Sequence, residues 1–309
     1  MGVAVDTNDH ARKQKFSHQA SHQRWIADGL LLLITVIWGT TFVIVKNLIV
    51  RVDPIALIGL RFLVASLAVT IVLAPRIRAM AKRTVSAGII IGLILFAGYV
   101  FQTIALEYTT ASKCGFITGL SVVLVPVFSA FILKKSPDLP SIVGVGFATV
   151  GLGLLSLNFS EATLLQTGDF LSLIGAIAFG LHIVAVGKAA PLHDVRILVI
   201  MQLWTVAIAS FVTLGLRVFV LGHTILMAPG SRELLGIGFL GILTTAVTLF
   251  VQNIAQKFTS PTHVAIIFAT EPVFAGIFGW WILGETFTRP QLAGAALIVV
   301  GMLVAEMMS

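Results

Sequence analysis

The chain has 309 residues, of which 58% are hydrophobic and 11% are charged, and its mean hydropathy is +1.04. Soluble domains carry about 25% charged residues, so this composition excludes a soluble protein and indicates a lipid bilayer as the solvent. The net charge of +7 is spread over loops and the N-terminal segment, which argues against nucleic-acid binding, and the single cysteine, Cys114, excludes a disulfide within the chain.

Residues 1–24 are polar, contain His10, His18 and His22, and show no apolar periodicity. We predict a disordered cytoplasmic tail here, because such a segment has little apolar surface to bury. The histidines are not accompanied by a cysteine, and neither a metal site nor a cofactor is expected. The next apolar segment is about 23 residues long without a small-residue cleavage pattern, which predicts a membrane span and not a cleaved signal peptide.

Ten apolar stretches follow, and each is long enough for a helix at roughly 20 residues per span. They cover about residues 27–49, 54–74, 85–106, 110–133, 138–157, 168–189, 195–221, 233–256, 261–283 and 288–308. The apolar runs are continuous, whereas barrel strands would alternate in polarity. We therefore predict an all-α integral membrane protein with a five-helix repeat at 25–158, a linker at 159–167 and a second five-helix repeat at 168–309.

The second half of the chain repeats the first. Gln102-Thr-Ile-Ala recurs 150 residues later as Gln252-Asn-Ile-Ala. The same offset relates Pro140 to Pro290, Gly144 to Gly294 and Gly151 to Gly301, and an offset of 141 relates Asp28 to Asp169 and Gly39 to Gly180. Because five is an odd number of spans, the second repeat must enter the membrane from the opposite side. Two inverted repeats can exchange conformations, which is the physical basis of alternating access.

The positive charges predict the orientation. With both chain ends cytoplasmic, the inner segments of the first half hold Arg12, Lys13, Lys15, Arg24, Arg76, Arg78, Lys82, Arg83, Lys134 and Lys135, against Lys46, Arg51 and Lys113 outside. The second half is evenly split. The excess of positive charge in the first half predicts a multi-pass protein of the inner cell membrane with both termini cytoplasmic.

Two prolines mark predicted helix breaks. Pro126 and Pro272 lie near the middles of the fourth and ninth spans and align at an offset of 146 residues. Proline removes a backbone donor, and in lipid the freed groups need partners in protein or in a cavity. Interrupted spans at corresponding positions point to a central site, with a simple packing kink as the alternative.

Glu271 lies about ten residues from either end of the ninth span. A charge at that depth costs about 3 kcal/mol, so we expect a protonated carboxyl group that binds a substrate amine or carries a coupling proton. The alternative is a neutral acid hydrogen-bonded to a neighbouring helix. At the offset of 146 its repeat partner is Val125, so its role is expected once per molecule.

Other polar residues are predicted at depth. His182, near the middle of the sixth span, either lines a cavity or bonds to a neighbouring helix. Arg61 lies about seven residues into the second span and is expected to snorkel to the outer interface. Gln102 and Gln252 are repeat equivalents near opposite membrane faces, which suits two symmetry-related gates, with a packing role as the alternative.

Aromatic residues complete the predicted substrate path. Trp38 in the first span lies deeper than an interfacial tryptophan, and Tyr99 lies one helical turn before Gln102. Both could offer surface to a small-molecule substrate. Thr118 in the fourth span is expected to face the same central cavity.

Short strings along the chain are similar to those of a known family. They include Trp38-Gly-Thr-Thr-Phe42, Arg61-Phe62, Ala105-Leu-Glu-Tyr-Thr-Thr-Ala-Ser112, Ser260-Pro-Thr262, Glu271-Pro-Val-Phe274, Leu283-Gly-Glu285 and Gln291-Leu-Ala-Gly294. The set resembles the drug/metabolite transporter superfamily, EamA type, over about residues 27–308. The resemblance implies a ten-helix inner-membrane carrier, often an exporter of amino acids or other metabolites, with Trp38-Gly39 and Glu271-Pro272 as candidate cavity residues.

The sequence therefore predicts a secondary transporter of small metabolites, with amino acids as one candidate class, that works by alternating access as a monomer or a homodimer. One alternative is an intramembrane enzyme, but His-Glu-x-x-His and paired aspartates at depth are not found. The other is a channel-like component, for which a ring of charges or a carbonyl filter would be expected.

Overall fold

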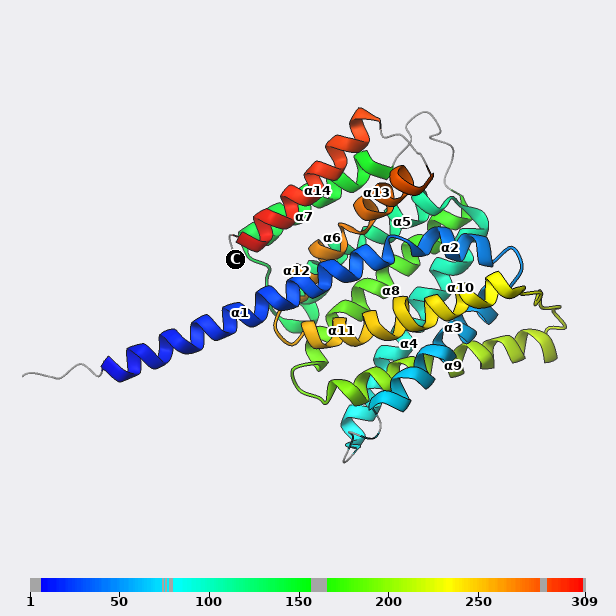
Figure 1. Ribbon diagram of the computed structural model, residues 1–309, viewed down its shortest axis with the longest axis horizontal. Helices are drawn as coiled ribbons and strands as arrows, with labels where there is room; N and C mark the ends of the chain where they lie inside the picture. Colours follow the sequence, from blue (N-terminus) through cyan, green and yellow to red (C-terminus); the bar gives the residue numbers. More distant parts are fainter. Residues whose placement is uncertain are drawn as a thin grey trace, which may run out of the picture.

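The computed structural model describes residues 7–73, 75, 77, 80–156, 166–283 and 288–307, which form helices joined by short connections (Figure 1). The helices are α1 (Thr7–Trp38), α2 (Thr41–Leu48), α3 (Pro54–Leu73), α4 (Lys82–Tyr108), α5 (Ala111–Gly119), α6 (Ser121–Leu133), α7 (Leu139–Ser156), α8 (Thr167–Ala189), α9 (Val195–Phe219), α10 (Ser231–Gly241), the π-helix η3 (Ile242–Val247), α11 (Thr248–Ala255), α12 (Pro261–Phe268), α13 (Glu271–Leu283) and α14 (Arg289–Met307). Within the described residues, eight segments are long and apolar enough to cross a membrane, and α7 and α14 are shorter apolar helices. The fold is thus an all-helical membrane protein with spans at the ten predicted positions.

Four of the ten spans are interrupted. Span 1 consists of α1 and α2, span 4 of α5 and α6, span 8 of α10, η3 and α11, and span 9 of α12 and α13. Spans 2, 3, 5, 6, 7 and 10 are the single helices α3, α4, α7, α8, α9 and α14. Most of the linker predicted at 159–167 lies outside the described residues.

The first helix differs from the prediction for the N-terminal segment. α1 begins at Thr7, inside the segment 1–24 that was expected to be disordered. Residues 7–24 include alanine, arginine, lysine and glutamine, which have high helix propensity, and they continue without a break into the first membrane span. This part of the chain extends away from the bundle in Figure 1.

The breaks in spans 4 and 9 correct the predicted role of Pro126. The break in span 4 falls at Leu120, after Gly119, and the break in span 9 falls at Ala269–Thr270. Leu120 and Thr270 are related by the 150-residue offset, so the breaks are equivalent although the prolines are not. Pro126 lies inside α6, where membrane helices tolerate a proline whose freed carbonyl finds another partner.

The same offset changes the repeat partner of Glu271. Glu271 begins α13 and Ser121 begins α6, so Ser121, and not Val125, occupies the equivalent place after the break. Pro272 does lie at a break, as predicted, as the second residue of α13. Helix ends, which the sequence does not mark, therefore define the structural equivalence better than the matching prolines.

The fifth spans of the two repeats, α7 and α14, lie side by side in Figure 1 and cross through glycines. A Cβ atom on Gly144 would lie 2.7 Å from the carbonyl oxygen of Gly301, and one on Gly151 would lie 2.6 Å from that of Gly294. Because the low-numbered glycine of α7 meets the high-numbered glycine of α14, the two helices run antiparallel. Equivalent helices of opposite direction are what inverted repeats require.

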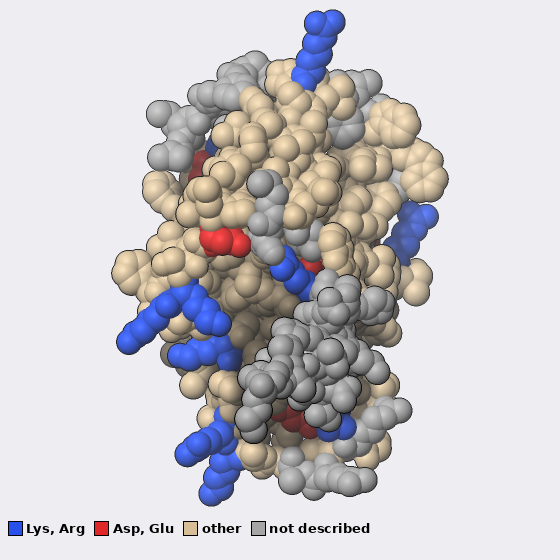
Figure 2. Space-filling model, turned by 90° about the vertical axis from the view of Figure 1, so that its left-hand side faces the viewer, with Lys and Arg blue, Asp and Glu red and all other residues tan. Residues whose placement is uncertain are grey.

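The start of the first membrane span and the end of α14 lie on one side of the bundle, which we call the termini side. The Nη2 atom of Arg24, near the start of the first membrane span, lies 2.8 Å from Nε2 of His263, and the same ring nitrogen lies 2.8 Å from the carbonyl oxygen of Ala305. Figure 2 views this side and shows Lys and Arg side chains projecting at several places, with acidic side chains over a smaller area.

Candidate functional site

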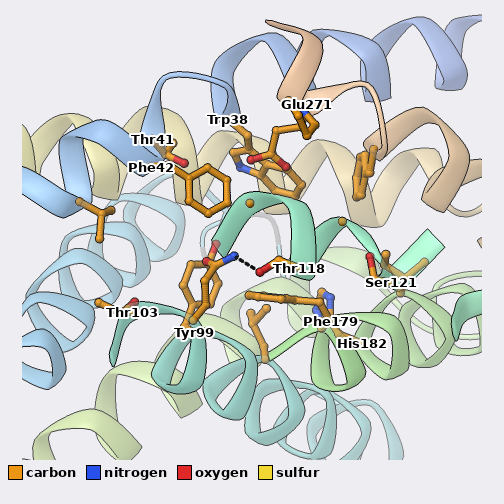
Figure 3. Close-up of a pocket in the computed structure, with 18 of the residues that line it drawn as sticks. Trp38, Thr41, Phe42, Tyr99, Thr103, Thr118, Ser121, Phe179, His182 and Glu271 are labelled. Atoms are coloured by element: carbon orange, nitrogen blue, oxygen red, sulfur yellow. Dashed lines mark hydrogen bonds between the residues drawn. The ribbon is translucent and has the colours of Figure 1, made fainter. Parts of the chain in front are cut away.

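A cavity of about 100 Å³ lies at the centre of the bundle, with room for several water molecules. Its walls come from spans 1, 2, 3, 4, 6, 8 and 9. The predicted residues Trp38, Tyr99, Gln102, Thr118, His182, Gln252, Glu271 and Pro272 all line it, whereas Pro126 is not among the lining residues (Figure 3). The breaks in spans 1, 4 and 9 all lie at this cavity.

The sequence reasoning missed most of the other lining residues, and three of them are aromatic or polar groups beside predicted ones. Phe179 corresponds to Trp38 at the 141-residue offset, and Ser121 corresponds to Glu271 at the 150-residue offset. The 141-residue offset would have found Phe179, whereas the 146-residue offset of the two prolines pointed to Val125 in place of Ser121. Phe268, the third, packs edge-on against Trp38, with ring centroids 4.9 Å apart, and has no such signal in the sequence.

The π-helix η3 holds Trp38 in place. The N–H of Thr248, which would donate to Thr244 in an α-helix, donates to the carbonyl of Thr245. The indole Nε1–H of Trp38 donates to the carbonyl oxygen of Thr244 at 3.0 Å and to the Thr248 hydroxyl at 3.2 Å. Single-turn π-helices of this kind are frequent at functional sites. The irregular turn thus links span 8 to the break in span 1.

Arg61 also reaches η3, which corrects the prediction that it snorkels to the interface. It is 6% exposed, and its Nη2 donates to the Thr244 hydroxyl at 3.1 Å and to the Thr244 carbonyl at 3.3 Å. Its Nε donates to the Thr245 hydroxyl. The guanidinium therefore finds its acceptors on a polar turn of span 8, inside the protein.

Aromatic rings surround this guanidinium. Its Cζ atom lies 4.8 Å from the ring centroid of Tyr99, and the Tyr99 hydroxyl lies 3.4 Å from Nη2. The Tyr99 ring in turn packs edge-on against Phe62 and Phe179, at centroid distances of 4.8 and 5.4 Å. A cation over an aromatic face is stabilised by the ring quadrupole, most strongly where water is excluded.

His182 belongs to a directional chain of hydrogen bonds. Its Nε2 lies 3.1 Å from Oε1 of Gln202, whose amide nitrogen donates to Oδ1 of Asn253 at 2.9 Å. The amide nitrogen of Asn253 donates to the carbonyl of Leu249 at 2.8 Å. An amide oxygen only accepts, so Nε2 of His182 carries the proton and Nδ1 is free to accept. Both predicted roles therefore hold together: His182 lines the cavity and bonds to a neighbouring helix.

The two repeat-equivalent glutamines have different surroundings. Gln252 is 1% exposed and donates to Gln256 at 3.2 Å, and Gln256 donates to the carbonyl of Ile183 at 2.8 Å. These contacts close span 8 onto span 6 on the termini side of the cavity. Gln102 is only partly buried and donates to the Thr118 hydroxyl at 3.4 Å, the dashed contact in Figure 3.

The carboxyl group of Glu271 makes no hydrogen bond or ion pair with any other residue in the described part of the chain. Glu271 is partly exposed to the cavity and lies beside Trp38 in Figure 3. It starts α13, where the positive end of the helix dipole favours a negative charge. Among the described residues, no three His, Cys, Asp or Glu side chains come together as metal ligands would.

Known proteins match this chain along nearly its full length. A relative from Archaeoglobus fulgidus, named an uncharacterized transporter, is 32% identical over 92% of this chain and 87% of its own. A protein from Salmonella typhimurium, named a probable amino-acid metabolite efflux pump, is 24% identical over 89% and 93% of the two chains. The uncharacterized inner membrane transporter YedA of Escherichia coli is 25% identical over 88% and 87%.

The fold and the repeats are matched as well. A protein of known crystal structure with 20% sequence identity superposes with a TM-score of 0.77, over 92% of this chain and 99% of the other. The EamA-like transporter family model matches twice, at residues 25–157 and 166–307, each match covering five spans. The chain is therefore a multi-pass membrane protein that belongs to the EamA-like transporter family.

Proposed function

We propose that this protein is a secondary transporter that exports small metabolites across the inner membrane by alternating access, with amino acids as the first class to test. The observation that carries the proposal is the unequal closure of two equivalent gates. On the termini side, α12 is almost entirely buried. Its repeat equivalent α5, on the other side of the cavity, is mostly half-buried.

The hydrogen bonds of the two glutamines also show tighter closure on the termini side. Gln252 is held in a buried network, whereas Gln102 has one long contact to a neighbouring hydroxyl. In an inverted-repeat carrier, exchange of these two arrangements would close the Gln102 side and open the Gln252 side. The present arrangement corresponds to closure on the termini side.

A predicted orientation and one relative underlie the choice of export. We take the termini side to be cytoplasmic, because the first half carries the excess of lysine and arginine on that side. Closure there corresponds to an outward-facing state, through which exporters and importers both pass, so the choice of export rests on the relatives. The probable amino-acid metabolite efflux pump from Salmonella typhimurium supports export, and the inner membrane transporter from Escherichia coli supports the inner membrane as the location.

Counterflow in proteoliposomes tests this proposal. Vesicles loaded with unlabelled metabolite should transiently accumulate the labelled compound, because an alternating-access carrier exchanges substrate across the membrane. Mixtures of amino acids and organic acids should be assayed with and without a pH gradient, against protein-free vesicles. A channel would equilibrate the label without overshoot, and an enzyme would change the compound itself, so either outcome would overturn the proposal.

A further inference from the structure

The helices α5 and α12, which open spans 4 and 9, begin with the same capping arrangement on opposite sides of the molecule. The backbone N–H of Lys113 donates to the hydroxyl of Thr110 at 3.2 Å, and that of His263 donates to the hydroxyl of Ser260 at 3.3 Å. Lys113 and His263 are therefore structural equivalents, as their separation of 150 residues in the chain also indicates. One repeat thus carries a permanent cation where the other carries a ring that titrates near neutral pH.

On the side away from the termini, Lys113 holds a buried carboxylate. Its Nζ atom lies 2.6 Å from Oδ2 of Asp169, a residue that is 5% exposed. The hydroxyl of Thr109 donates to Oδ1 of Asp169 at 3.4 Å, and the backbone N–H of Gln166 donates to Oδ2 at 2.9 Å. Each carboxylate oxygen therefore accepts a hydrogen bond. We call Lys113, Asp169 and Thr109 the lysine trio.

The equivalent residues on the termini side, found at the offsets of 150 and 141 residues, are His263, Asp28 and Thr259, which we call the histidine trio. All three are buried. Neither carboxylate oxygen of Asp28 nor the hydroxyl of Thr259 has a hydrogen-bond partner among the described residues. The Nε atom of Arg24 lies 3.7 Å from Oδ2 of Asp28, too far for a hydrogen bond. A buried carboxylate without a donor is costly, so this trio lacks the bond that Lys113 supplies in the other.

The ring of His263 lies between a donor and an acceptor. Its Nε2 atom is 2.8 Å from Nη2 of Arg24 and 2.8 Å from the carbonyl oxygen of Ala305, and its Nδ1 atom is 3.2 Å from the hydroxyl of Ser260. A guanidinium only donates, so a hydrogen bond from Arg24 requires a lone pair on Nε2, which a protonated ring does not have. Protonation would therefore turn an attraction between α1 and α12 into a repulsion between two cations.

Two carboxylates are placed to receive a protonated ring. Asp28 of α1 and Asp138, just before α7, act on His263 electrostatically, as does Arg24. The other charged groups at the ends of helices packed against α12 are exposed to solvent: Lys134 and Lys135 after α6 and Lys188 at the end of α8. Asp28 is the buried member of the pair, and its position matches that of Asp169 beside Lys113.

We propose that the histidine trio binds one proton and that this protonation opens the termini side of the cavity. The inference rests on the proposed function only in taking the two repeats to exchange arrangements. In that exchange the histidine trio adopts the bonded arrangement that the lysine trio has now, on the side where α5 is mostly half-buried. His263 can replace Lys113 in this arrangement only as a cation, so proton binding and opening are linked. His263 is not a lining residue of the cavity described above, so the proton controls access from one side and is not itself carried.

Labelling of a cysteine at Thr118 in a Cys114→Ser background tests the inference through access to the cavity. Right-side-out and inside-out membrane vesicles present the two faces in turn to an impermeant methanethiosulfonate. Each rate is divided by that of the denatured protein at the same pH, which removes the titration of the thiol itself. From the termini side, this parent protein should label about 10-fold faster at about pH 6 than at about pH 8, a factor within the usual range of coupling between two sites. With His263→Gln added, labelling should be slow at both pH values.

Further variants separate the charge from the ring. His263→Lys gives the histidine trio the permanent cation of the lysine trio, so labelling from the termini side should be fast at both pH values. Adding Asp28→Asn to this variant removes the partner of the cation and should restore slow labelling. Lys113→Arg keeps the cation of the lysine trio and is the matched control, expected to respond to pH as the parent does.

The parent and its His263→Gln variant decide the question even if His263→Lys does not fold. A parent whose labelling from the termini side does not change with pH, or a His263→Gln variant that keeps the change, would overturn the inference. Counterflow together with pH-independent labelling would leave the proposed function standing without the switch. Labelling that depends on pH and His263, without counterflow of any metabolite, would overturn the proposed function alone.

Discussion

Gly144 of α7 and Gly301 of α14 meet backbone to backbone, and the contact is reciprocal. A Cβ atom on either residue would lie 2.7 Å from the carbonyl oxygen of the other. The repeat equivalents of these residues, Gly294 and Gly151, form the second such contact, with both reciprocal distances at 2.6 Å. The pseudo-twofold axis therefore maps one contact onto the other, and the two repeats are joined where only glycine fits.

This crossing predicts that alanine lowers the stability of the protein at the two contact glycines of α7 and not at two other glycines of the same helix. Gly144→Ala and Gly151→Ala should each destabilise the protein by about 1–3 kcal/mol, because the added methyl group must push backbone apart. Gly146 and Gly153 lie on the same helix with nothing within 4 Å of an added Cβ, so their alanine variants are the controls. Thermal unfolding of the detergent-solubilised protein measures all four, and equal losses in both pairs would contradict the crossing.

Membrane topology can be tested with single cysteines in a Cys114→Ser background. Lys134 follows α6 and His223 follows α9, and both are exposed. The ten-span order places them on opposite sides, with Lys134 in the cytoplasm. An impermeant thiol reagent applied to intact cells should label the cysteine at His223 and spare that at Lys134. Labelling of both positions from one side would rule out the ten-span order.

The hydrogen bonds of Trp38 allow the contribution of its indole N–H to be tested separately from that of its aromatic ring. Trp38→Phe keeps an aromatic ring against Phe268 but leaves the Thr244 carbonyl without the indole donor. We expect a stability loss of about 1 kcal/mol and a lower transport rate. The control is Trp281→Phe, because Trp281 is 73% exposed and outside the cavity. Equal transport by the two variants would show that the bond to η3 does not hold the site.

The two glutamines should bias the gates in opposite directions. Gln252→Ala removes a contact of the buried network on the termini side and should open that side, whereas Gln102→Ala should favour opening on the other side. A cysteine at Thr118 in the Cys114→Ser background reports access to the cavity. Its labelling rate should rise from the termini side in the first variant only. Identical rates in both variants would leave the glutamines as packing residues.

Glu271 should determine the pH dependence of transport. Glu271→Gln keeps the shape of the side chain and its capacity to hydrogen-bond but removes the exchangeable proton. We expect normal insertion and a transport rate that is lower by about 10- to 100-fold or no longer responds to a pH gradient. Glu107→Gln, at an exposed position near the end of α4, serves as the control.

Initial rates across a range of pH values, at matched expression, decide the question. Superimposable curves for wild type and Glu271→Gln would make Glu271 a structural residue. His182 would then become the next candidate for a coupling site, because it lines the cavity and its Nε2 begins the hydrogen-bond chain through Gln202.

The amino-acid sequence alone determined the membrane class, the ten spans and the repeat. Hydropathy is a local property, and a bilayer sets the length of each apolar segment, so spans can be read without knowledge of packing. The odd number of spans per repeat then predicts inversion. Depth within a span identified Trp38, His182 and Glu271 as candidates, because polar and aromatic groups are rarely placed there without a partner.

Tertiary structure decided where helices end and where charged groups find partners. The break at Leu120 and the π-turn at Thr244 depend on neighbouring helices, and no proline marks either position. Arg61 illustrates the same limit. Its depth in the span allowed the side chain to reach the membrane interface. In the structure, its Nη2 atom lies 3.3 Å from the carbonyl oxygen of Thr244, a residue 183 positions away in the chain. Long-range hydrogen bonds of this kind, and not local propensity, assemble the cavity.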